Sequence, residues 1–262
     1  MTNPHGTAGL RWLVMILLCG CGGASGADEV PPQVSVASFS SASSQQVFKH
    51  WQSYRFSLFG ASTHYQLAQQ NGHQVLQAVS KKTASGLIHN LTVSLTDHPI
   101  LHWRWKITKL PTNADDHSKQ GDDHSARLYV IFEAPQVSLL GWLKNATGLE
   151  RTHALSYIWA NQAPANTLLA SPYTERSMMI AANSGRSQIG QWVSLSRNVA
   201  ADYQRAFGTS PPPVSAIAIM TDGDNTDSLL TSYYGDIYFA RTQLSATSQQ
   251  APLAQPATNP LP

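Results

Sequence analysis

Cysteine is almost absent from this chain. The two cysteines, Cys19 and Cys21, both lie close to the N-terminus, in a stretch that resembles a secretion signal. Removal of that signal leaves no free cysteine in the part that folds. A disulfide framework, a cysteine metal site and a cysteine nucleophile are therefore excluded, and the core alone must hold the fold together.

Charge is scarce as well. Lysine, arginine, aspartate and glutamate make up 12% of the 262 residues, against about 25% in an average protein. The formal net charge is +2, and no basic block occurs anywhere in the chain. Nucleic acid is therefore not expected as a partner. A surface dominated by serine, threonine, asparagine and glutamine is typical of an envelope protein that meets polar, neutral matter such as glycans.

Common enzyme signatures are missing. The chain has no G-x-S-x-G, no H-E-x-x-H and no phosphate-binding loop. Glutamate, the usual acid in glycan hydrolysis, occurs only four times and never in an acidic patch. Carboxylate chemistry on a glycan would therefore need a pair of aspartates, with their carboxyl groups about 5–9 Å apart.

The N-terminus indicates export. Arg11 precedes the apolar run 12–18, which is too short to cross a bilayer but suits a signal peptide. The run ends in Leu18-Cys19-Gly20-Cys21, which resembles the bacterial lipobox. This predicts a lipoprotein signal over residues 1–20, diacylation of Cys21 and anchoring on the periplasmic face of the outer membrane. Cleavage after Ala27 is the alternative and would give a soluble periplasmic or secreted protein.

Composition divides the remainder into three parts. Residues 21–46 are rich in proline and serine and are expected to form a tether. Residues 47–243 form one uniform stretch, of a size suited to a single β-sandwich domain. Residues 244–262 contain four prolines and no periodicity, which predicts a disordered tail.

Short alternating runs predict a mostly β domain. Asn71-Gly72 between two such runs, 63–70 and 73–80, is a strong hairpin signal. One helix is expected over residues 199–207, with Asn198 as its N-cap and Gly208 as its stop. The fold class that fits best is all-β, a two-layer antiparallel sandwich of jelly-roll type with this one short helix, and a distorted barrel is second. Further strands are expected at 91–95, 101–108, 126–132, 155–160, 178–182, 192–196, 214–220 and 233–240.

Eight of the fifteen acidic residues lie in two short patches. The first precedes the strand 126–132, and the second follows the strand 214–220. In an antiparallel sheet the start of one strand lies beside the end of its neighbour, so both patches could share one rim. Crowded carboxylates repel one another unless a cation, an arginine or a ligand hydroxyl holds them. The patches consist of Asp115, Asp116, Asp122, Asp123 and of Asp222, Asp224, Asp227, Asp236.

The turn 222–227 is the candidate metal site. Asp222, Asp224 and Asp227 stand at positions 1, 3 and 6, a spacing at which oxygen ligands can surround calcium or another hard cation. The alternative is an Asx-rich turn whose side chains cap their own backbone. His117 and His124 each follow a pair of aspartates and could bind zinc, although chance explains them better.

A ligand site is expected nearby. Arg127 could pair with Asp122 or Asp123, or with a carboxylate of a substrate. Asp236 and the loop residue Trp142 complete the candidate ligand-binding set, Trp142 as a platform for a sugar ring. Trp103 and Trp105 alternate with apolar residues and are expected in the core.

Several of these strings resemble a bacterial secreted family, that of domain of unknown function 3047. The resemblance runs over about residues 47–241 and is strongest in QGDDHSARLYVIF (120–132) and in AIAIMTDGDNTDSLLTSYYGDIYF (216–239). It implies a secreted, β-rich protein and assigns no activity.

The preferred functional interpretation is a non-catalytic, membrane-tethered module that binds a saccharide and holds a structural cation. The alternative is a β-sandwich polysaccharide hydrolase or lyase that uses an aspartate pair. Carboxylates converging on one point would favour a metal. A pair facing an open groove would favour catalysis, and sealing of the carboxylates by Arg127 and backbone amides would favour a purely structural role.

Overall fold

Alternating apolar residues build two β-sheets in this computed structural model. The structure describes residues 32–55, 61–132 and 153–241, and all of them belong to one compact unit. Cys21, Trp142, the signal peptide and the C-terminal tail lie outside the described residues. Within the described ranges, no helix is long and apolar enough to cross a membrane.

Sheet A has seven strands in the described part of the chain. Their order is β1-β14-β6-β13-β4-β3, and β11 pairs with the other edge of β6. All these pairs are antiparallel. The strands are β1 (Gln33–Ala37), β3 (His64–Gln70), β4 (His73–Lys81), β6 (Ile100–Ile107), β11 (Val193–Asn198), β13 (Leu229–Tyr234) and β14 (Ile237–Ala240).

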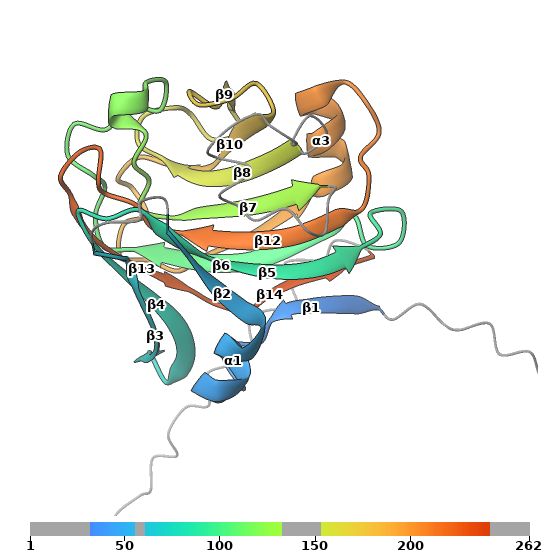
Figure 1. Cartoon of the computed structure of the whole chain (residues 1–262), viewed down its shortest axis with the longest axis horizontal. Helices are drawn as coiled ribbons and strands as arrows, with labels where there is room; N and C mark the ends of the chain where they lie inside the picture. Colours follow the sequence, from blue (N-terminus) through green and yellow to red (C-terminus); the bar gives the residue numbers. More distant parts are fainter. Residues whose placement is uncertain (1–31, 56–60, 133–152, 242–262) are drawn as a thin grey trace, which may run out of the picture. The chain divides into compact units, whose positions relative to one another are not determined.

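Sheet B also has seven strands among the described residues, in the order β2-β5-β12-β7-β8-β10-β9. Figure 1 shows β8, β7, β12 and β5 side by side. Only β8 and β10 run parallel; the other neighbours are antiparallel. The strands are β2 (Trp51–Arg55), β5 (Ser85–Val93), β7 (Arg127–Phe132), β8 (His153–Ala160), β9 (Leu168–Ala170), β10 (Ser177–Ser184) and β12 (Val214–Met220).

The core lies between the inner faces of the two sheets. Trp103 and Trp105 of β6 pack against Tyr157 and Trp159 of β8, with ring centroids 5.1 and 6.3 Å apart. The ring N–H of Trp105 donates to Asn183 at 2.7 Å, so burial leaves it paired. The expected sandwich and the core role of these two tryptophans are confirmed.

Local signals in the sequence explain the turns and helix ends. Asn71 and Gly72 have φ values of 52° and 79°, and they join β3 to β4 as the hairpin signal predicts. Helix α3 (Val199–Phe207) begins after Asn198, whose side chain accepts from the amide of Ala201. It ends at Gly208, which has φ 73°.

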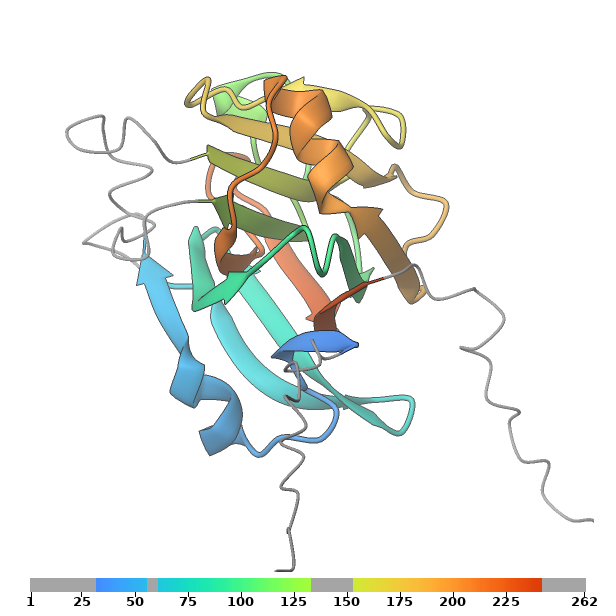
Figure 2. The ribbon, with the colours of Figure 1, turned by 90° about the vertical axis from the view of Figure 1, so that its right-hand side faces the viewer.

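The expected tether is wrong for residues 33–46. Strand β1 pairs with β14, and helix α1 (Ser44–His50) contacts β2. Figure 2 shows α1 and α3 well apart. The sandwich therefore has two helices rather than the expected one. The capping box that starts α1, Ser43 with Gln46, is visible in the sequence but was read as part of the linker.

The expected strand 233–240 is also wrong, because it breaks at Gly235-Asp236. Strand β13 pairs with the end of β6, and β14 pairs with its beginning. The break places Asp236 at the outer face of sheet A instead of inside a continuous ladder.

Also described is the short 3-10 helix η1 (Lys119–Gly121), which precedes the first acidic strand end. Ser118 caps it by accepting from the amide of Gly121. Gly121 is close to Asp115: an added Cβ would lie 2.3 Å from the backbone nitrogen of Asp115. This close approach folds the segment before β7 back on itself and brings its aspartates to the sheet edge.

Candidate functional site

The two acidic patches meet at one rim of sheet B, as the strand pattern predicts. Met220, the last residue of β12, stands opposite Arg127, the first residue of β7. The amide of Asp222 donates to the carbonyl of His124 at 3.3 Å, so the chain segments beyond the two strand ends stay together. We call the group formed by Asp116, Asp122, Asp123, His124, Arg127, Asp222 and Asp224 the acidic rim.

Arg127 is the central cation of the acidic rim and is 4% exposed. Its Nη2 lies 3.3 Å from Asp122 Oδ1 and 3.3 Å from Asp222 Oδ2. The same nitrogen donates to the carbonyl of Asp122 at 3.1 Å. Burial opposes the charge of Arg127, but the charges of Asp122 and Asp222 outweigh it and raise the pKa well above its usual value. The internal ion pair, one of the two roles considered for Arg127, is thus present.

His124 extends this network to Asp116. Arg127 Nη2 lies 2.6 Å from His124 Nδ1, which must accept because a guanidinium only donates. The proton of the neutral imidazole then sits on Nε2, 3.3 Å from Asp116 Oδ1. Burial, followed by the charge of Arg127, lowers the pKa of His124 and favours this neutral form. Both ring nitrogens face partners within the protein, so His124 is a structural link here.

Asp116 is held by backbone amides. Its carboxylate accepts from the amides of Asn161, Gln162 and Ala163 at 2.8–2.9 Å. Burial would raise the pKa of Asp116, but the contact with His124 and these three amides outweigh it and hold the pKa well below its usual range. This part of the rim matches the structural role expected for sealed carboxylates.

Three carboxylates converge on one point. Asp123, Asp222 and Asp224 each offer an oxygen, and these oxygens all lie within 4.8 Å of one another. Asp123 and Asp222 are buried, whereas Asp224 is exposed. Burial, together with the neighbouring carboxylates, raises the pKa of Asp222 well above its usual value and also raises that of Asp224. A hard cation accepts such oxygens as ligands and would relieve the repulsion.

The expected third ligand, Asp227, does not belong to this group. Its side chain is 77% exposed, and its carboxylate lies 3.2 Å from Lys82 Nζ. Asp227 has φ 59°, a left-handed turn conformation that aspartate tolerates. Its place is taken by Asp123, which also accepts from the amide of Thr226 at 2.6 Å. The turn 222–227 is therefore both an Asx-rich turn and part of the three-carboxylate group.

Asp236 lies apart from the acidic rim, on the outer face of sheet A. Its two carboxylate oxygens accept from the amide and the hydroxyl of Ser40. It borders a cavity of about 320 Å³ that we call the sheet A groove. The groove is lined by His102, Trp103, Arg104, Ser194, Leu195, Asp236 and Tyr238.

Strand register explains why polar residues line the sheet A groove. Leu101 and Trp103 of β6 face the core, so His102 and Arg104 face outward. His102 stands opposite Tyr238 of β14, and their rings stack with centroids 4.8 Å apart. Arg104 stands opposite Ser194 of β11. Three strands thus bring an aromatic ring, a guanidinium and hydroxyl groups to one concave surface.

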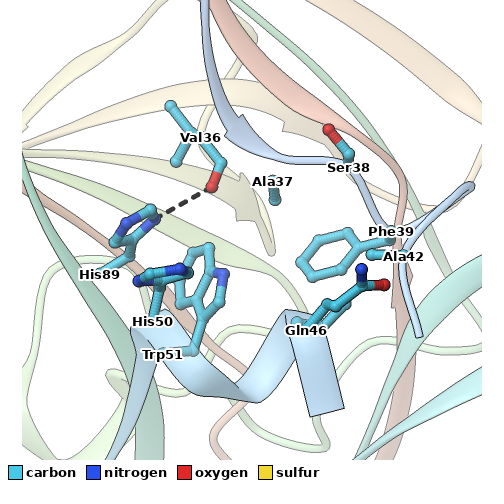
Figure 3. Close-up of a pocket in the computed structure, with 10 residues that line it drawn as sticks. Val36, Ala37, Ser38, Phe39, Ala42, Gln46, His50, Trp51 and His89 are labelled. Carbon is cyan, nitrogen blue, oxygen red and sulfur yellow. Dashed lines mark hydrogen bonds between the residues drawn. The ribbon is translucent and has the colours of Figure 1, made fainter. Parts of the chain in front are cut away.

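A second cavity, of about 170 Å³, lies where α1 meets the sheets. Figure 3 shows His50, Trp51 and His89 on one side of it and Phe39 and Gln46 on the other. His89 contacts the carbonyl of Val36 through Nδ1 at 3.0 Å and stacks on His50. Burial lowers the pKa of His89. This cavity is mainly apolar and serves as the seat of the N-terminal segment.

Sequence reasoning missed the sheet A groove. His102 and Arg104 were visible as the polar face of their strand, but which strands flank β6 depends on long-range pairing. It also missed the structural roles of Asp116 and His124, because their partners come from residues 161–163 and from Arg127. The ligand-binding roles expected for Asp122, Asp123 and Asp236 stay predictions.

Solved structures with a similar fold include three carbohydrate-related proteins. The glycoside hydrolase domain of Endo-D from Streptococcus pneumoniae R6 is 7% identical, with a TM-score of 0.37; the likeness covers 74% of this chain and 22% of that one. A family 30 carbohydrate-binding module is 12% identical, with a TM-score of 0.39, and the coverage is 78% and 86%. Endoglucanase Cel12A from Rhodothermus marinus is 10% identical, with a TM-score of 0.40, and the coverage is 71% and 92%. The chain thus spans about a fifth of the length of the first of these proteins.

No curated protein sequence matches this chain. A protein family does match, over residues 49–238, a range that runs from the end of α1 into β14 and includes both the acidic rim and the sheet A groove. Because the match covers most of the sequence, the chain belongs to the family described as "Protein of unknown function (DUF3047)".

Proposed function

We propose that this protein is a non-catalytic saccharide-binding module of the bacterial cell envelope. The observation that carries the proposal is the sheet A groove, whose cavity of about 320 Å³ is at the lower end of the range for small-ligand sites. The half-buried ring of Tyr238 can pack on the apolar face of a pyranose. Arg104, Ser194 and the carboxylate of Asp236 offer the donors and acceptors that sugar hydroxyls need.

The setting of the carboxylates supports binding rather than hydrolysis. Among the described residues that line the groove, Asp236 is the only acid, and Ser40 already engages both of its oxygens. In the acidic rim, Asp122, Asp123 and Asp222 are 4%, 0% and 3% exposed. Glycoside hydrolysis needs a carboxyl pair on either side of an accessible bond. The hydrolase or lyase alternative therefore has less support than binding.

A structural cation at the acidic rim is the second part of the proposal. Asp123, Asp222 and Asp224 would hold it, with calcium as the first candidate because all three ligands are oxygen. Arg127 contacts Asp222 but not Asp123 or Asp224, so most of the negative charge of the three is not neutralised internally. The cation would tie the β12–β13 turn to the segment before β7.

The lipid anchor completes the proposal. Cys21 in the lipobox-like sequence would carry the lipid and place the folded part on the periplasmic face of the outer membrane. Mass spectrometry of the chain expressed in a bacterial host checks this directly: a diacylated N-terminal Cys21 is expected, and a mature chain starting at Asp28 would contradict it.

Saccharide binding is tested by affinity electrophoresis of the full chain through gels containing different polysaccharides. We expect retardation by at least one polysaccharide and a roughly tenfold weaker affinity in Tyr238→Ala, equivalent to about 1.4 kcal/mol. Tyr173→Ala is the matched control, because Tyr173 is an exposed aromatic residue beside the acidic rim and outside the groove. Equal loss in both variants would place binding elsewhere, and release of reducing ends from the retained polysaccharide would favour the hydrolase alternative.

The cation is tested by thermal unfolding in calcium and in chelator. Calcium at about 100 times its dissociation constant adds about 2.7 kcal/mol, which corresponds to roughly 5–10 °C at this size. The shift should vanish in Asp224→Asn and persist in Asp227→Asn, whose carboxylate is in the same turn but outside the group. A shift lost in both variants would assign the effect to the turn as a whole.

A further inference from the structure

We infer that the sheet A groove binds an acidic saccharide, with Arg104 as the seat for the carboxylate of a uronic acid. This inference rests on the proposed saccharide-binding function and names the class of sugar. It starts from the charges in and beside the groove. His102, Arg104 and Lys106 alternate along the outer face of β6, and the carboxylate of Asp236 is occupied by Ser40.

Arg104 has no anionic partner among the described residues. Its guanidinium takes part in no ion pair or hydrogen bond there, although the residue is only partly exposed. Its one printed contact of this kind is with the ring of Trp192, 4.8 Å from the Cζ atom. A guanidinium withdrawn from water gains strongly from a carboxylate, because two parallel N–H bonds can form. A ligand can supply the group that the protein does not.

The position of Arg104 is fixed by its neighbours. The side chain crosses Gly235: a Cβ on this glycine would lie 2.4 Å from both Cγ and Nε of Arg104. The amide of Gly235 also donates to the carbonyl of Arg104 at 2.9 Å. Glycine on one side and Trp192 on the other thus hold an uncommitted guanidinium at the groove. Such preorganisation lowers the entropy cost of ligand binding.

Lys106 adds a second positive charge on the same face. Its Nζ lies 4.8 Å from the centre of the Tyr233 ring and 5.6 Å from that of Trp192. It donates to Gln70 Oε1, a neutral acceptor, so its charge is not cancelled. A polymer of uronic acids presents carboxylates in series, and one placed on Arg104 would leave the next free to approach Lys106.

A planar carboxylate suits this seat better than a neutral sugar does. The stacked guanidinium directs its N–H groups along its own plane, where both oxygens of one carboxylate can accept. Tyr238 at the other side of the groove can pack on the sugar ring that bears the carboxylate. Hydroxyl groups alone would use the donors of Arg104 without neutralising its charge.

The test is isothermal titration of the full chain with galacturonate and mannuronate oligomers, each compared with its neutral hexose counterpart of equal length. We expect at least one uronate to bind about 30-fold or more tightly than its neutral partner. Arg104→Gln should reduce uronate affinity 10- to 100-fold and change neutral affinity less than threefold. Arg186→Gln, which removes the same charge from an exposed site outside the groove, should bind like the parent.

The outcomes separate this inference from the proposed function. Neutral oligosaccharides that bind as tightly as uronates would overturn the acidic specificity and leave saccharide binding intact. Absence of binding to every saccharide would remove both. Binding of sulfated but not uronate oligomers would also overturn the inference, and uronate binding that survives Arg104→Gln but fails in Arg186→Gln would move the seat away from the groove.

Discussion

Arg127 and Arg104 solve the same electrostatic problem in opposite ways. Arg127 is almost fully buried, and its charge is matched by two carboxylates at 3.3 Å. Arg104 is partly buried, stacks on Trp192 and has no carboxylate partner within the described part of the chain. A cation with internal partners contributes to the fold, whereas one held in place without them is available to a ligand. The comparison assigns stability to the acidic rim and recognition to the sheet A groove.

Replacing each arginine by methionine should separate these roles by the largest margin. Arg127→Met leaves two buried carboxylates unpaired, and breaking a buried pair costs about 3–5 kcal/mol. The melting temperature should fall by roughly 6–20 °C. Arg104→Met should change stability by only about 0.5 kcal/mol, as for other substitutions outside the core. Thermal unfolding followed by circular dichroism measures both, and similar losses in the two variants would break the comparison.

Asp222 offers a second contrast within the acidic rim itself. Burial and the charges of Asp123 and Asp122 raise its pKa, although Arg127 opposes the shift. The fold therefore favours the protonated form: this contribution to stability is complete below the unfolded-state pKa of about 3.9 and is lost as the pH rises through the folded-state pKa. In chelator, Asp222→Asn should be more stable than the parent at neutral pH, by about 1 kcal/mol.

Urea unfolding at several pH values checks this prediction. The advantage of Asp222→Asn should shrink as the pH falls and disappear near pH 4, because the parent carboxyl is then protonated as well. Calcium should stabilise the parent and not the variant if Asp222 is a ligand. A variant that is less stable than the parent at every pH would mean that the Arg127 pair outweighs the repulsion.

Protonation of His124 should have an effect of opposite sign. Burial and then Arg127 lower the pKa of His124 in the fold. Its contribution to stability is therefore complete above the unfolded-state pKa of about 6.5 and is lost as the pH falls below that value toward the folded-state pKa. Nitrogen NMR of the imidazole should show a neutral ring protonated at Nε2 at pH 6.5. A doubly protonated ring at that pH would contradict the assigned network.

The sequence predicted those features that depend on neighbours in the chain. The Asn71-Gly72 hairpin, the caps of α3 and the core face of β6 all follow from local patterns, and the structure has them. The shared rim also followed, since only one assumption, pairing of β7 with β12, was needed. The break at Gly235 was missed because residues 233–240 alternate like one strand, and only the pairing with β6 shows that they form two.

Exchange of Asp227 for Asp123 in the three-carboxylate group has a different cause. Spacing within a turn identifies oxygens that could converge, but it cannot show that the turn folds over a residue 100 positions earlier. Asp123 reaches the turn because Asn225 and Thr226 donate their amides to its carboxylate. Likewise, the groove combines β6, β11 and β14, whose adjacency no local pattern contains.

Gly235→Ala should give the smallest change in stability and the sharpest test of the groove. The added Cβ would fall 2.4 Å from Arg104, but the atoms that it meets belong to a long side chain that can move away. The fold should therefore lose only about 0.5 kcal/mol. Arg104 would leave its position against Trp192, and uronate affinity should fall about tenfold even though both charge and fold are preserved.

Titration of Gly235→Ala with the uronate oligomers and its melting curve together complete this test. Gly72→Ala is the matched control, because it makes the same change in an exposed hairpin turn at the far end of β3 and β4. It should retain uronate affinity although its positive φ makes alanine strained there. Unchanged uronate affinity in Gly235→Ala, with Arg104 still required, would mean that the guanidinium needs no fixed position, and the groove would then select acidic sugars by net charge rather than by geometry.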